Sequence, residues 1–87
     1  MLPKERISTH PGRILLREFL DPSGITQAKL ARDLGLARQE LNRLVRGRSA
    51  MTAKMAWGLS NYFHNSAEFW MQLQIAHELT VARLNRR

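Results

Sequence analysis

The chain contains no cysteine among its 87 residues. This absence excludes disulfides, zinc sites with thiolate ligands and cysteine nucleophiles, and it fits a reducing compartment. No apolar run reaches the roughly 18 residues that a membrane-spanning helix needs, and the N-terminal segment MLPKERISTH has no signal-peptide core. We therefore expect a protein of the cytoplasm that has no membrane partner.

Motifs typical of enzymes are also missing. The sequence has no glycine-rich phosphate loop and no nucleophile elbow, and its three histidines are scattered at His10, His64 and His77. We predict no catalytic residue, no metal site and no cofactor, whereas RNA cleavage that depends on the histidines would indicate a nuclease. Four aromatic side chains are expected to pack inside the protein rather than to stack on bases: Trp57, Tyr62, Phe63 and Trp70.

Positive charge is abundant and unevenly distributed. Lysine and arginine number 14 against seven aspartates and glutamates, which gives a net charge of +7. Segment 27–51 has a net charge of +4, compared with +1 for 1–26 and +2 for 52–87. Such an excess favours a polyanionic partner, most often nucleic acid. A helical adaptor that binds an acidic protein through the same surface is the alternative from another functional class.

Apolar spacing and capping signals predict five helices with short connections and no strand. The first helix begins near Pro11 and is ended by Asp21-Pro22-Ser23-Gly24, because Pro22 disfavours helix at Asp21 and Gly24 tolerates positive φ. A second helix is predicted over 27–34 and a third from Arg38 to about Arg46. The length suits a single domain over 9–87, preceded by a mobile arm over 1–8.

Capping residues also mark the last two predicted helices. Thr52 is a suitable N-cap for a fourth helix through Phe63. Asn65, with Glu68 three residues later, resembles a capping box for a longer fifth helix that runs towards Leu84.

The third predicted helix combines an apolar side with a cationic side. At about 100° per residue, Leu41, Leu44 and Val45 share one side, and the opposite side carries Arg38, Gln39, Asn42, Arg43 and Arg46. Arginine can pair with guanine and an amide with adenine, and a helix fits the major groove. We therefore predict that Arg38, Gln39 and Arg43 read bases. Gln27, Arg46 and Arg48 are predicted to contact phosphates.

The fifth predicted helix carries two apolar stripes. The first would pack on the core and comprises Phe69, Trp70, Leu73 and Ala76. The second would be exposed in a monomer, and from it we predict that Met71, Ile75 and Leu79 form a homodimer interface. The alternative is that both stripes are core. A twofold dimer would place its recognition helices roughly 34 Å apart and would bind an inverted repeat in double-stranded DNA.

Long segments of the sequence resemble a known family. TQAKLARDLGLARQELNRLVRGRSAMT is similar to the Cro/C1-type helix-turn-helix of bacterial and phage regulators. The flanking segments HPGRILLREFLDPSGIT and MTAKMAWGLSNYFHNSAEFWMQLQIAHEL resemble HigA-type antitoxins, so that the resemblance covers about residues 9–79. It implies a compact, lambda-repressor-like all-α domain with base-reading positions at Arg38, Gln39 and Arg43, and a DNA contact at Asn42.

The resemblance also implies partners. Members of this family dimerise, bind a palindromic operator in their own promoter and neutralise a HigB-like toxin, an mRNA-cleaving ribonuclease of the RelE-like type. A stand-alone or phage-type regulator without a toxin is the alternative.

Two departures from the family concern stability. Ala37 stands where relatives usually have a Ser or Thr N-cap, which costs about 1 kcal/mol. Gly58 lies inside a helix, where glycine costs up to about 1 kcal/mol relative to alanine.

Overall fold

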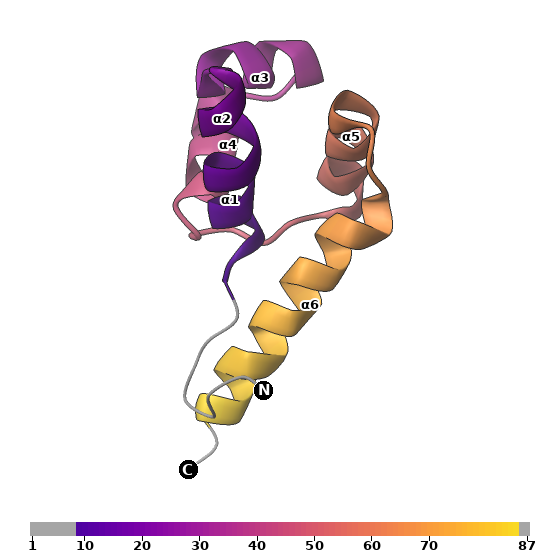
Figure 1. Ribbon diagram of the computed structural model, residues 1–87. Coiled ribbons are helices and arrows are strands. Elements are labelled where there is room, and N and C mark those ends of the chain that lie inside the picture. Colours follow the sequence, from indigo (N-terminus) through magenta and orange to yellow (C-terminus); the bar gives the residue numbers. More distant parts are fainter. Residues whose placement is uncertain (1–8, 86–87) are drawn as a thin grey trace.

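The computed structural model describes residues 9–85 and contains only helices (Figure 1). The elements are α1 (Pro11–Ile14), η1 (Leu15–Leu20), α2 (Asp21–Ser23), α3 (Gln27–Leu34), α4 (Arg38–Val45), α5 (Ala53–Phe63) and α6 (Ala67–Leu84). Because α1, η1 and α2 follow one another without a break, they form a single rod. Residues 9–85 therefore form five helical rods and contain no strand. The predicted helix count is therefore confirmed, whereas the predicted N-terminal arm over 1–8 lies outside the described residues.

The first rod ends within the segment that the sequence marks. It continues through Pro22 to Ser23 and ends at Gly24, which has φ 69°, as its tolerance of positive φ predicts. The prediction that Pro22 disfavours helix at Asp21 is wrong because η1 is π-helical, with the Asp21 N–H bonded to the Leu16 carbonyl. This wider turn changes which carbonyl faces the proline ring, so the helix can continue past a residue that would interrupt a regular α-helix.

The N-cap of α6 also differs from the prediction. Ser66, not Asn65, is the capping residue, and its hydroxyl oxygen accepts a hydrogen bond from the Phe69 N–H (3.0 Å). The Asn65 side-chain oxygen instead accepts from the indole N–H of Trp70 (2.9 Å). A buried indole needs such a partner, so Asn65 serves the core rather than the helix end.

The core is built from buried leucines of the first four rods together with Trp70 of α6. Its fully buried side chains, each at most 1% exposed, include Leu15, Leu20, Leu30, Leu41, Leu44, Leu59 and Trp70. Phe19 packs on both Phe63 and Trp70, with ring centroids 5.0 Å apart in each pair. The expectation that all four named aromatics lie inside is wrong for Trp57, which is 60% exposed.

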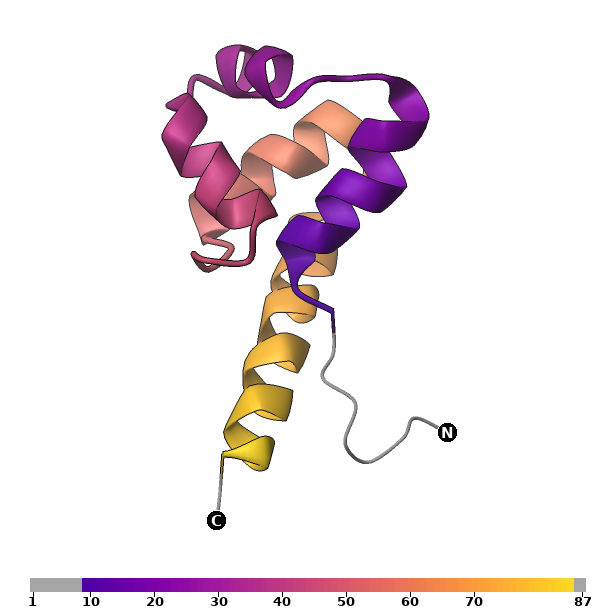
Figure 2. The ribbon, with the colours of Figure 1, turned by 90° about the vertical axis from the view of Figure 1, so that its left-hand side faces the viewer.

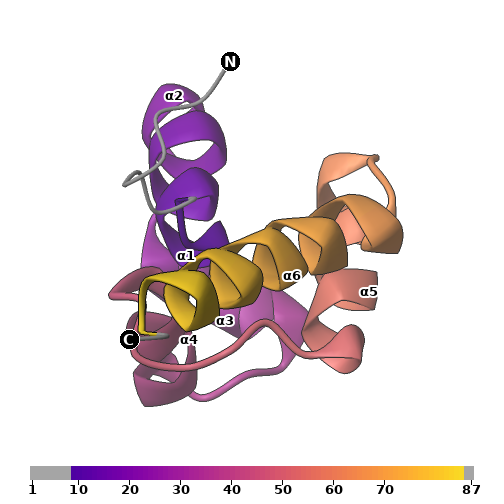
Figure 3. The same cartoon turned by 90° about the horizontal axis from the view of Figure 1, so that it is seen from below.

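Helix α6 begins beside α5 and then crosses the molecule. Seen from below, it runs from α5 towards the side where α1 and α4 lie (Figure 3), and its C-terminal half extends beyond the other helices (Figure 2). The side that faces the protein includes the buried Gln74, whose oxygen accepts from the Met51 N–H (2.8 Å). This bond attaches α6 to the connection between α4 and α5.

Candidate nucleic-acid interface

Helices α3 and α4 are joined by a tight turn that depends on a glycine. Gly35 has φ 71°, a left-handed conformation that costs glycine little. Two backbone hydrogen bonds close the turn, from the Gly35 N–H to the Arg32 carbonyl (3.2 Å) and from the Leu36 N–H to the Ala31 carbonyl (2.8 Å). The two helices are therefore held as one unit.

Helix α4 presents the two sides that its sequence predicts. Leu41 and Leu44 are fully buried and Val45 is 5% exposed, so this side anchors α4 to the core. The opposite side is exposed and carries Arg38, Gln39, Asn42, Arg43 and, at the C-cap, Arg46. Because the apolar side is fixed, the polar side has a definite direction relative to the rest of the molecule.

All seven predicted DNA-contacting residues line one continuous surface. An open concavity is lined by Gln27, Arg38, Gln39, Asn42 and Arg43. A neighbouring concavity is lined by Arg13, Leu16, Gln27, Asn42, Val45, Arg46 and Arg48. Gln27 and Asn42 belong to both, and the Asn42 Nδ2 donates a hydrogen bond to the Gln27 Oε1 (3.2 Å). The amide pair therefore lies where the two concavities meet.

Sequence reasoning missed two arginines on this side of the molecule. Arg13 lines the second concavity, and Arg13, Arg17 and Arg46 together line a third. These residues belong to α1, η1 and the end of α4, which are far apart in the sequence. The surface of positive charge is thus wider than α4 alone.

The close contact between α1 and α4 explains why Arg13 lies next to Arg46. Gly12 packs so tightly on α4 that a Cβ atom at this position would lie 1.8 Å from the Leu44 carbonyl oxygen. Only glycine allows two backbones to approach so closely. A glycine in the first turn of a predicted helix is the sequence signal for such an approach, but the signal does not identify the partner.

His10 connects the start of α1 to the connection that follows α4. Its Nδ1 accepts from the Gly12 N–H (2.9 Å), which caps α1, and its Nε2 donates to the Ser49 carbonyl (2.9 Å). These two bonds require the neutral ring. Burial, and then the neighbouring His77, lower the pKa of His10, and the bond to Ser49 opposes this change.

Two of the three histidines that are scattered in the sequence meet in space. The rings of His10 and His77 lie 4.9 Å apart at an interplanar angle of 77°. His64 instead ends α5 with φ 60°. Within residues 9–85, no group of three or more His, Asp or Glu side chains could hold a metal ion.

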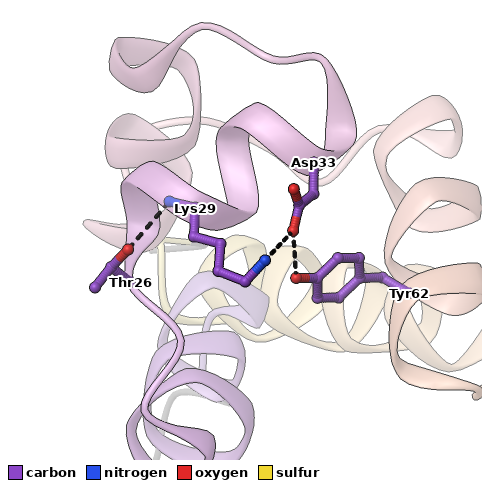
Figure 4. A network of polar contacts seen from close by, with 4 residues as sticks. All are labelled: Thr26, Lys29, Asp33 and Tyr62. Carbon is purple, nitrogen blue, oxygen red and sulfur yellow. Dashed lines mark hydrogen bonds and ion pairs between the residues drawn. The ribbon is translucent and has the colours of Figure 1, made fainter.

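A polar network attaches α3 to α5 (Figure 4). The Asp33 Oδ2 accepts from both the Lys29 Nζ (2.9 Å) and the Tyr62 hydroxyl (2.7 Å). Hydrogen bonds from Lys29 and then Tyr62 lower the pKa of Asp33, and the bond to Asp33 raises the pKa of Tyr62. Across residues 9–85, Lys29–Asp33 is the only ion pair, so the arginines of the two concavities have no carboxylate partner in that part of the chain.

Among known proteins, the chain is similar to helix-turn-helix proteins and to antitoxins. The helix-turn-helix family pattern matches residues 16–70. The antitoxin HigA-1 of Vibrio cholerae is 38% identical over 72 residues, which are 83% of this chain and 68% of that protein. The structure of Pseudomonas aeruginosa antitoxin HigA with the higBA promoter has 43% identity and a TM-score of 0.83, with 86% of this chain and 82% of that chain covered. The structure of antitoxin GraA in complex with its operator has 38% identity and a TM-score of 0.87, with 98% and 86% covered.

Curated relatives are longer than this chain, which spans 62–78% of their lengths.

Two short helices with a glycine turn and an exposed polar side on the second define a helix-turn-helix DNA-binding domain. The chain belongs to the helix-turn-helix family and, within it, to the HigA-type antitoxins. The predicted all-α fold is thereby confirmed, and the family consists of DNA-binding regulators rather than enzymes. No helix among residues 9–85 could span a lipid bilayer.

Proposed function

We propose that this protein is an autoregulatory antitoxin that binds, as a homodimer, an inverted-repeat operator in its own promoter. One observation carries the proposal: α4 is anchored by a buried apolar side, and its polar side joins Gln27 in a single open concavity. The solved structures of a related antitoxin with a promoter and of another with its operator support the same partner. Such a repressor must reach its operator, so the proposal places the protein in the cytoplasm, where bacterial DNA lies.

The contacts divide into base reading and phosphate binding. Arg38 and Gln39 occupy the first turn of α4, the part that enters the major groove in this class, and Arg43 lies one turn further on. We propose that Gln27 at the start of α3, together with Arg46 and Arg48 after α4, contacts phosphates. Arg13 adds a cation that the structure brings to the same surface.

A gel-shift assay on the upstream DNA tests this division. The Arg38→Ala, Arg43→Ala double variant is expected to lose specific retention, because arginines that read bases contribute about 1–3 kcal/mol of discrimination each. The matched control is Arg32→Ala with Lys54→Ala, which removes the same charge from exposed residues outside both concavities. If both double variants bind like the wild type, the base-reading assignment fails.

The homodimer is proposed to form through α6. Ile75 and Leu79 of α6 are 52% and 66% exposed. Met71, the third predicted interface residue, is half-buried against the core and would contribute only its exposed edge. An exposed apolar stripe at helical spacing favours an interface with a second copy.

Sedimentation tests the dimer. Ile75→Asp with Leu79→Asp is expected to produce a monomer that keeps the helical content of the wild type. Trp57→Asp serves as the comparison, because it removes a similarly exposed apolar side chain from α5. A dimer that survives the first change and dissociates with the second would locate the interface on α5 instead.

The toxin is the remaining part of the proposal. We infer from membership of the HigA-type family that the partner is a HigB-like toxin that cleaves mRNA in the manner of RelE-like ribonucleases. Co-expression with the product of the neighbouring gene is expected to yield a stable complex in which RNA cleavage is inhibited. A neighbouring product that neither binds nor cleaves RNA would favour a stand-alone regulator.

A further inference from the structure

The hydrogen bond between the side chains of Gln27 and Asn42 crosses the helix-turn-helix. Gln27 is the first residue of α3 and is half-buried, whereas Asn42 lies on the exposed side of α4. The Asn42 Nδ2 donates to the Gln27 Oε1 at 3.2 Å. Since this pair lies where the two concavities meet, it connects the proposed phosphate-binding region to the proposed base-reading region.

This bond determines which end of the Asn42 amide is free. One N–H of Asn42 is used by Gln27, which leaves the other N–H and the Oδ1 for a ligand. A free asparagine could rotate its amide by half a turn and exchange these two groups. While the Gln27 oxygen accepts from Asn42, that rotation would place two oxygens together and is therefore unfavourable.

A phosphate would fix the orientation of Gln27 in turn. The Gln27 oxygen faces Asn42, so its two N–H groups remain available as donors, and a phosphate oxygen accepts only from donors. Arg46 and Arg48, which line the second concavity with Gln27, favour an anion there. A phosphate held by Gln27 would consequently set the orientation of the Asn42 amide.

The exposed groups of Asn42 match one base. Adenine offers an N6–H donor and an N7 acceptor at the major-groove edge, whereas guanine offers two acceptors there. The free oxygen and N–H of Asn42 can satisfy both adenine groups but only one guanine group. We propose that Gln27 is a positioning residue that orients Asn42 to read an adenine, so that a phosphate contact at α3 governs base selectivity at α4. This inference rests on the proposed operator binding.

The test uses the full-length protein and duplexes that carry single base-pair changes in the operator. The position at which Asn42→Ala loses discrimination identifies the base that Asn42 reads, and it is expected to be an adenine. At that position Gln27→Ala is expected to reduce the preference for adenine about tenfold, as the loss of one oriented hydrogen bond implies. Replacing this adenine by 7-deazaadenine should weaken the wild type but have little effect on Gln27→Ala.

Gln27→Glu separates positioning from phosphate binding. Glutamate keeps an oxygen that accepts from Asn42, but it repels phosphate, so overall affinity should fall while the adenine preference remains. Selectivity at the base read by Gln39, an amide with no bond to Gln27, should be unchanged in all three variants and serves as the internal control. Thermal unfolding checks that each variant is folded.

The inference is overturned if Gln27→Ala lowers affinity equally for all duplexes, because Gln27 would then contact phosphate only. It is also overturned if Asn42→Ala loses discrimination at a base other than adenine. A wild-type protein that binds no duplex specifically would instead overturn the proposed function itself, so the two failures are distinguishable.

Discussion

Replacing Gly12 with alanine would test the contact that places α1 against α4. The added Cβ would lie 1.8 Å from the oxygen and 2.6 Å from the carbon of the Leu44 carbonyl, and 3.0 Å from the Cα of Val45. All three atoms belong to the backbone, so no side chain can rotate to make room. The apolar side of α4 is itself fully buried, and the two helices must therefore move apart.

The cost of this movement is that of an overpacked interior. Insertion of a methyl group into a well-packed site costs about 1–3 kcal/mol, and a rigid backbone neighbour favours the upper end. In a domain of this size, each kcal/mol lowers the melting temperature by about 4–8 °C. We expect a free-energy loss of about 2–3 kcal/mol and a melting temperature lower by about 10–20 °C.

The same substitution at Gly58 is the matched control. A Cβ at Gly58 would lie 3.4 Å from the Leu34 Cδ2, which is an ordinary contact with the end of a flexible side chain. Because Gly58 lies inside α5, alanine should stabilise the helix by up to about 1 kcal/mol. Calorimetry should therefore show a lower melting temperature for Gly12→Ala and a higher one for Gly58→Ala than for the wild type. A Gly12→Ala protein that melts with the wild type would refute the close contact between α1 and α4.

Three further changes have defined outcomes. Ala37→Ser should stabilise the protein by about 1 kcal/mol in urea unfolding, because the N-cap of α4 is already extended (φ −69°, ψ 144°) and lacks only the accepting oxygen; an unchanged midpoint would contradict this. Tyr62→Phe should raise the pKa of the Asp33 carboxyl, measured by NMR titration, since the phenol donates to that carboxylate. The pKa of His10 in the folded protein is lower than the 6.5 of an ordinary histidine. Its contribution to stability is therefore complete above about pH 6.5 and is lost as the pH falls through the pKa of the folded state. The advantage of the wild type over His10→Asn, which can cap α1 without titrating, should accordingly shrink between pH 7.5 and pH 5 in thermal melts.

Local patterns in the sequence were sufficient to predict the helices and the two sides of α4. Leu41, Leu44 and Val45 recur at helical spacing and are buried together, so the exposed positions between them follow from geometry alone. Resemblance to the HigA-type family agrees with the fold that results. These predictions succeed because the angular position of a residue on a short helix is set by its spacing from neighbours within two turns.

Other features of the candidate interface depend on residues far apart in the chain. The hydrogen bond from Asn42 to Gln27 spans 15 residues, and the one from His10 to Ser49 spans 39. Arg13 joins the basic surface only because Gly12 packs on the Leu44 carbonyl. Helical periodicity says which side of a rod is apolar, but it does not say which rod will cover that side or at what distance. Local chemistry therefore determined the rods and their polar sides, whereas the packing of backbone on backbone decided which side chains meet.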